Sequence, residues 1–127
     1  MSSFSDYLEN ALLDHVFRNT ALTSPTNVYV ALYTVAPTDA GGGTEVSGSG
    51  YARQAITFGA ASGGSITNTT VVSSTASGGN FGNIVAVGIF DAITAGNLLA
   101  WDAVTSTTIN DGDTFRIEIG NHTITLD

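Results

Sequence analysis

The side chains with the most evident chemistry are two histidines, His15 and His122, and eleven carboxylic acids. His15 follows Asp14 and the chain contains many serines, so the residue types of a hydrolytic triad are present. No G-x-S-x-G elbow leads from a predicted strand into a helix, however, and His15 lies on a predicted helix stripe, where a packing role is more usual. His122 begins a predicted strand beside a turn. The sequence therefore predicts no catalytic residue and no cofactor.

The N-D-G-D motif at residues 110–113 gathers oxygen ligands of the kind that hold calcium. It lacks the loop length and the terminal glutamate of an EF-hand, and the same residue types form ordinary turns. We therefore predict no metal site. A sugar hydrolase needs two carboxylates about 5 to 10 Å apart across a cleft. Asp91, Asp102 and Glu118 are available, but their spacing singles out no pair.

Composition excludes several further classes of function. The 127 residues are 43% hydrophobic and only 11% charged, against about 25% charged in ordinary soluble domains. The formal net charge is −8, and the cations are three well-separated arginines without any lysine. Because phosphate groups are bound by clustered cations, we expect no nucleic-acid partner and no membrane partner. The absence of cysteine excludes disulfides and thiolate metal sites.

One segment near the N-terminus has helical periodicity. Within residues 5–17 the apolar positions Leu8, Ala11, Leu12 and Val16 recur at the spacing of one helix face. An acid at position 6 followed by another at position 9 suggests a capping box, and acids in a first turn suit the helix dipole. The sequence therefore predicts a short amphipathic helix.

The rest of the chain has the alternation and turn composition of short strands. The 16-residue connection at 35–50 is rich in glycine and long enough to be functional or mobile. Gly88 indicates a bulge or a close backbone approach. Gly120 and Asn121 match a two-residue hairpin loop, with one continuous strand as the competing interpretation. Strands are predicted over residues 27–34, 51–58, 66–74, 84–91, 97–104, 114–119 and 122–126.

Connections too short for crossover helices favour antiparallel pairing. We therefore predict a mainly β fold, an antiparallel β-sandwich or barrel of about seven or eight strands with one N-terminal amphipathic α-helix. Residues 1–127 would form a single domain, in which residues 1–20 are a helical arm and residues 27–127 are the β-domain.

Apolar and aromatic positions on this fold suggest contacts with other molecules. Tyr and Trp are enriched at protein interfaces, although they also fill cores. For Trp101 we predict a core or subunit-interface role. We expect Arg53 and Arg116 to pair with acids across strands or subunits as weak, exposed ion pairs. The predicted interface residues are Leu8, Leu12, Val16, Tyr29, Tyr33 and Trp101.

Longer stretches of the chain resemble a known protein family. They are ALLDHVFRNTA, NVYVALYTVAPTDAGGGTEVSGSGYARQAITF, VGIFDA and GNLLAW, followed by NDGDTFRI and ITLD. In this order they are similar to short virion proteins of tailed bacteriophages, commonly labelled tail-fibre proteins. The resemblance implies a component of the virion, assembled in the host bacterial cytoplasm, and it carries no catalytic residues.

Three functions from different classes follow. The first is a non-enzymatic virion subunit that self-associates as a homotrimer and docks on the major capsid or tail protein, as a capsid decoration (cement) protein or a small tail appendage. The second is a tail-fibre module that binds host glycans through loops such as 35–50. The third, and least favoured, is a glycan hydrolase.

Overall fold

The computed structural model describes residues 3–126. Its largest sheet has six strands, all paired antiparallel, in the order β1, β8, β7, β2 and β3, and β4 also pairs with β2. The long central strands are rich in Val, Ile, Ala and Leu, which suit a sheet buried on both faces. The strands are β1 (Ser3–Phe4), β2 (Val28–Val35), β3 (Thr44–Glu45), β4 (Gln54–Ile56), β7 (Gly82–Phe90) and β8 (Leu98–Ile109).

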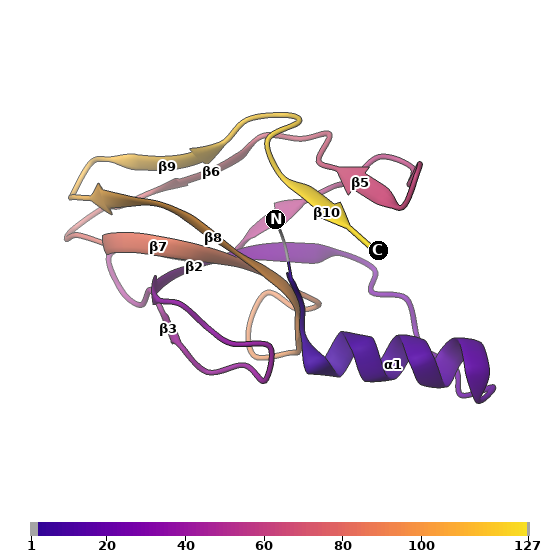
Figure 1. Ribbon diagram of the computed structural model, residues 1–127. Coiled ribbons are helices and arrows are strands. Elements are labelled where there is room, and N and C mark those ends of the chain that lie inside the picture. Colours follow the sequence, from indigo (N-terminus) through magenta and orange to yellow (C-terminus); the bar gives the residue numbers. More distant parts are fainter. Residues whose placement is uncertain (1–2, 127) are drawn as a thin grey trace.

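Two short ribbons form a second layer over one face of this sheet (Figure 1). One pairs β6 (Val72–Thr75) with β9 (Thr114–Ile117), and the other pairs β5 (Ser65–Thr67) with β10 (Thr123–Thr125). The predicted antiparallel β-sandwich is therefore confirmed. It contains ten strands in the described residues instead of seven or eight, because the predicted strand 66–74 is divided and the short strands β1 and β3 lie where none was predicted.

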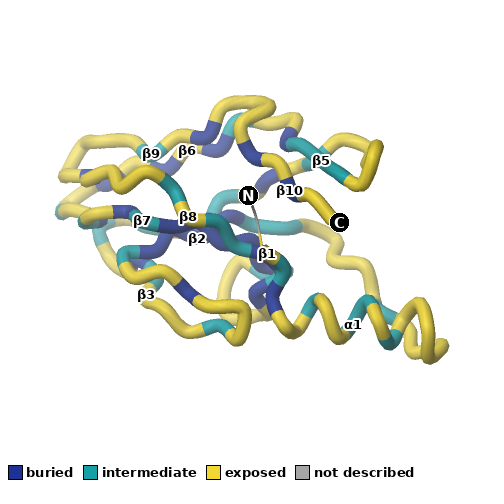
Figure 2. The backbone as a smooth tube through the Cα atoms, in the orientation of Figure 1, coloured by how far each residue is buried: buried dark blue, intermediate teal, exposed yellow. Residues whose placement is uncertain are grey.

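The main core lies between the two layers. Val30 and Leu32 of β2 pair with Ile89 and Val87 of β7, and all four point into this core. The opposite face of the same sheet carries a smaller cluster of Ala31, Tyr33, Ala86, Phe90 and Leu98. Figure 2 shows the buried positions concentrated in the central strands.

The single described helix, α1 (Asp6–Phe17), begins one residue earlier than a cap at Asp6 would require. Ser5 is the N-cap: its hydroxyl accepts a hydrogen bond from the Leu8 N–H at 3.2 Å and donates one to the Leu98 carbonyl. The Ser5 N–H also donates to the Leu99 carbonyl at 2.9 Å. The predicted capping box starting at Asp6 is therefore wrong, because the buried Ser5 ties the helix start to β8 and supplies the cap.

The helix ends where Asn19 adopts a left-handed backbone conformation, with φ of 55°. The Thr20 N–H then donates to the Asp14 carbonyl at 3.1 Å, which also accepts the Arg18 N–H at 3.0 Å. Figure 1 shows α1 extending from one end of the sandwich.

One buried side chain explains two wrong strand predictions. Asn68 is 2% exposed and interrupts the predicted strand 66–74, so that β5 and β6 belong to different ribbons. Its amide nitrogen donates to the carbonyls of Thr70 and Glu118, and its amide oxygen accepts from the N–H groups of Gly120 and His122. The predicted hairpin around Gly120 is also wrong, as is the continuous strand, because β9 pairs with β6 and β10 pairs with β5.

Other boundaries differ for local reasons. The predicted strand 51–58 is reduced to β4, and the connection 35–50 contains β3 and a turn closed by hydrogen bonds between Thr38 and Gly41. The close approach predicted at Gly88 is confirmed. A Cβ atom there would lie 2.9 Å from both Leu98 Cδ1 and Tyr33 Cε2.

Candidate interaction surface

Helix α1 exposes most of its apolar side chains. None of its residues is buried, and the exposed fractions of Leu13, Val16 and Phe17 are 56%, 64% and 78%. With 3.6 residues per turn, these three side chains and Leu12 share one face of the helix. Apolar side chains gathered on one helix face and left in water are typical of an unoccupied contact surface.

This face forms one wall of a groove that we call the apolar trough. Its first part has a volume of about 530 Å³, and it adjoins a recess of about 210 Å³ that shares Phe4 and Leu126 with it. The recess continues along the ribbon of β5 and β10. The first part is lined by Phe4, Glu9, Leu12, Leu13, Val16, Phe17 and Leu126. Ile66 and Ile124 are among the residues that line the recess.

Glu9 is the one charged side chain that lines the apolar trough in the described part of the chain. The three arginines of the protein all have other partners. Arg18 pairs with Asp14 at 3.1 Å, Arg116 with Glu118 at 2.5 Å, and Arg53 with Glu45.

The structure divides the predicted interface residues between two places. Leu12 and Val16 line the trough, whereas Leu8 is half-buried and is not among its lining residues. Sequence reasoning missed Leu13 and Phe17. The available signal was their position one residue after Leu12 and Val16, which widens the apolar stripe.

Tyr29, Tyr33 and Trp101 lie on the sheet face that carries the smaller apolar cluster. Tyr33 is buried in that cluster, while Tyr29 and Trp101 are half-buried. The Trp101 indole N–H donates to Asp39 Oδ1 at 2.9 Å, so it fixes the loop after β2. In the protomer these aromatic side chains therefore contact their own chain, away from the trough.

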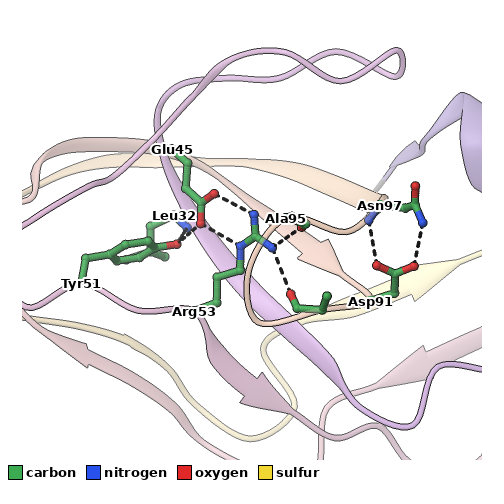
Figure 3. Close-up of polar contacts among 8 residues, drawn as sticks. Leu32, Glu45, Tyr51, Arg53, Asp91, Ala95 and Asn97 are labelled. Carbon is green, nitrogen blue, oxygen red and sulfur yellow. Dashed lines mark hydrogen bonds and ion pairs between the residues drawn. The ribbon is translucent and has the colours of Figure 1, made fainter.

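A buried ion pair covers the same sheet face (Figure 3). Arg53 donates through Nε and Nη2 to the two oxygens of Glu45, both at 2.9 Å, and the Tyr51 hydroxyl donates to Glu45 Oε2 at 2.5 Å. Arg53 Nη1 donates to the carbonyls of Ala92 and Ala95 at 3.0 and 2.7 Å. The guanidinium carbon also lies 3.7 Å from the centroid of the Phe90 ring.

The prediction of an exposed ion pair is wrong for Arg53, which is 8% exposed. Arg53 lies one residue before β4, and its side chain bridges β3 and the loop between β7 and β8, where hydrogen bonds to Glu45 and to two carbonyls replace water. Arg116 forms the exposed pair that was predicted, but its partner Glu118 lies two residues further along the same segment and not across strands.

The protonation states around Arg53 are fixed near neutral pH. Burial and then the Glu45 carboxylate raise the pKa of Tyr33 to about 12, and the pKa of Tyr51 also rises through burial and its hydrogen bond to Glu45. Burial alone would raise the pKa of Glu45, but hydrogen bonds from Arg53 and Tyr51 outweigh it and lower that pKa. This arrangement stabilises loops and has no group poised to exchange a proton at neutral pH.

The remaining candidates for chemistry also have structural roles. Asp91 accepts hydrogen bonds from the backbone N–H and the side-chain amide of Asn97 at 2.7 and 3.0 Å (Figure 3). His15 Nδ1 accepts from the Leu22 N–H at 3.1 Å. His122 is buried beside the Phe58 ring, and its Nε2 has no hydrogen-bond partner within the described residues. Burial lowers the pKa of His122, against the opposite effect of Asp102.

The N-D-G-D motif at 110–113 closes a turn. The Asn110 N–H donates to Asp113 Oδ2, and the Gly78 N–H donates to Asp111 Oδ1, both at 3.0 Å. Across residues 3–126 no group of three or more His, Asp or Glu side chains is arranged to hold a metal ion. In the same residues no helix is both long and apolar enough to cross a membrane.

The fold and the site together define a small antiparallel β-sandwich with an exposed, apolar helical arm. Comparison with protein families shows that the chain belongs to the family described as podophage GP4 fiber I protein gp80, whose model matches residues 3–125. The match covers α1 and all ten strands. No curated protein matches the chain. The resemblance to phage tail-fibre proteins is thus confirmed, and the protein is a component of the phage virion.

Proposed function

We propose that this protein is a non-enzymatic structural subunit of the phage particle and that α1 attaches it to a larger virion protein. The observation that carries the proposal is the exposure of Leu13, Val16 and Phe17 on a helix whose cap is anchored to β8. Burying an apolar side chain of this size contributes about 1.5 to 3 kcal/mol. Three such side chains therefore provide enough apolar area to drive attachment.

The family description supports a place in the tail fibre more than on the capsid lattice. A tail appendage is therefore our preferred version of the structural role, and capsid decoration is the alternative. Copy number separates them, because a lattice protein is present in far more copies per particle than a fibre subunit. Quantitative mass spectrometry of purified particles against the major capsid protein measures this ratio.

Self-association as a homotrimer is a further part of the proposal. It is supported by the general tendency of small β-domains in assemblies to form closed symmetric oligomers. Sedimentation equilibrium of the full chain tests it, and a monomer at every accessible concentration would exclude it.

A second candidate function is glycan binding. A recess of about 650 Å³ lies between α1 and the segment that follows it. Its lining includes an exposed aromatic ring at Tyr7, the Asn10 amide and the carboxylates of Asp14 and Asp91. Aromatic faces and amide or carboxylate groups are the features that bind sugars. A glycan array probed with the full chain, and then with Tyr7→Ala, tests this function.

The attachment role is tested with Leu13→Ser/Phe17→Ser. Both side chains are exposed, so the variant should fold with an unchanged melting temperature but be lost from purified particles when it replaces the wild-type protein. The matched control is Ile119→Ser, since Ile119 is 61% exposed outside α1. Normal incorporation of the double variant would exclude α1 as the attachment element.

A further inference from the structure

We infer that the apolar trough takes a cationic amphipathic segment of another virion protein and not a second copy of this chain. The inference rests on the proposed attachment through α1 and names the chemistry of the partner. Three observations support it: the shape of the trough, the negative charge of Glu9 in its lining, and the ion pairs that the three arginines form within their own chain.

The shape suits a short segment with one apolar face. The trough runs along α1, and a 12-residue helix is about 18 Å long. It continues past Phe4 and Leu126 to the apolar recess beside β5 and β10. A partner helix of two or three turns would place its apolar side chains between Leu13 and Leu126, as in other helix-in-groove complexes.

Charge determines what must flank those apolar side chains. On the helical wheel Glu9 lies between Val16 and Leu13, within the apolar face itself. A partner that covers this face removes water from the Glu9 carboxylate. Burial of an unpaired charge is strongly unfavourable, so a stable complex needs a cation opposite Glu9.

A second copy of the chain is poorly suited to supply that cation. The protein has no lysine, and Arg53 is held beneath its ion pair with Glu45. Arg18 and Arg116 are exposed, but each would have to leave an acid of its own chain, Asp14 or Glu118, unpaired to reach Glu9 of another copy. A copy would also bring its own net charge of −8 to the contact. The same argument disfavours an anionic lipid surface. A segment with lysine or arginine beside its apolar stripe satisfies both requirements.

The test uses two labelled helical peptides as probes. One has leucines on one face flanked by lysines, and the other has glutamates in place of the lysines. We expect fluorescence anisotropy to show the full chain binding the lysine peptide at least about tenfold more tightly, because only that peptide can form a charge-assisted contact with Glu9. Leu13→Ser/Phe17→Ser should abolish the binding.

The charge variants locate the effect. Glu9→Gln should weaken binding of the lysine peptide about tenfold, and Glu9→Lys should reverse the preference between the peptides. Glu118→Gln makes the same change of net charge outside the trough and should leave the affinity unchanged. Equal weakening by Glu9→Gln and Glu118→Gln would overturn the inference, because it would mean non-specific attraction to an acidic protein.

Two other occupants give distinct results. Concentration-dependent dimerisation that Leu13→Ser/Phe17→Ser abolishes, seen by sedimentation velocity, would identify a second copy and overturn the inference. Co-sedimentation of the full chain with phosphatidylserine vesicles would overturn it in favour of a membrane.

If particle incorporation depends on Leu13 and Phe17 but not on the charge at position 9, only this inference fails. If incorporation depends on neither apolar residue, the attachment role itself fails.

Discussion

Arg53 is the side chain whose surroundings differ most from those of an ordinary arginine in this protein. It is ion-paired with Glu45, stacked over Phe90 and bonded to the carbonyls of Ala92 and Ala95. Its pKa is raised by the hydrogen bonds from its side chain to Glu45, against the effect of burial. One residue therefore joins β3 to the loop between β7 and β8.

Arg53→Met should lower the free energy of unfolding by about 3 kcal/mol. Removing one partner of a buried pair leaves the Glu45 carboxylate uncompensated, which is the costly case. Arg116→Met is the matched control and should cost under about 1 kcal/mol, because its pair is exposed. Chemical denaturation of the two variants measures the difference, and equal losses would contradict a structural role for Arg53.

The lowered pKa of Glu45 implies acid sensitivity. Because the folded-state pKa lies below the ordinary value of 4.5, the stabilisation is complete above that value and is lost as the pH falls through the folded-state pKa. Glu45→Gln should therefore flatten the dependence of melting temperature on pH below about 4.5. A slope identical to that of the wild type would show that other carboxyls dominate.

His122 should act in a separate, higher pH range. Burial lowers its pKa below 6.5, so the unfolded chain binds a proton first and stability falls as the pH drops below about 6.5. His122→Phe removes the titrating group while keeping a ring beside Phe58. We expect the melting temperature of this variant to stay level between about pH 6.5 and 5, where that of the wild type falls.

At the scale of elements, the second layer depends on where its strands are interrupted. The side chain of Asn68 forms hydrogen bonds with four backbone groups, in the connections between β5 and β6 and between β9 and β10. Helix α1 similarly depends on Ser5, whose hydroxyl both caps the helix and bonds to β8. In each case one small polar side chain sets the position of a whole element.

Asn68→Ala should destabilise the protein by about 1 to 3 kcal/mol, since it leaves the buried His122 N–H without its partner. The amide of His122 should lose protection from hydrogen exchange before the amides of β7 do. Asn121→Ala, in the exposed turn nearby, is the control and should have little effect. Uniform protection across the Asn68→Ala variant would contradict the local role of this residue.

At the scale of the whole molecule, stability and contact with other molecules belong to different parts. The sandwich buries its apolar side chains between two layers, whereas α1 buries none. The arm is therefore free to meet a partner without loss of the fold, which suits the proposed attachment role.

This separation predicts opposite outcomes for two apolar truncations. Ile84→Ala, in the middle of the main core, should cost about 2 to 5 kcal/mol of stability, because it leaves a cavity. Phe17→Ala should change the free energy of unfolding by less than about 0.5 kcal/mol. Urea denaturation of both variants measures this, and a large loss for Phe17→Ala would mean that α1 is part of the core.

Residue order along the chain was sufficient for the local features. Alternating positions predicted β2, a largely apolar run predicted most of β7, and helical spacing predicted α1. The turn at residues 62–65 follows from its glycines and serines. These features depend on neighbours within a few residues, so local periodicity contains the information. The longer motifs likewise indicated the phage family before any contact was known.

Contacts between distant residues determined the rest. Three features join segments that are tens of residues apart in the chain. They are the hydrogen bond from the buried Asn68 side chain to Glu118, the hydrogen bond from Arg53 to the loop after β7, and the pairing of β9 with β6. The same holds for the trough, since Leu126 meets the face of α1 only after both termini have packed beside β8 and β5. Periodicity identifies an apolar helix face, but only the packing of the other elements determines whether that face is covered or left for a partner.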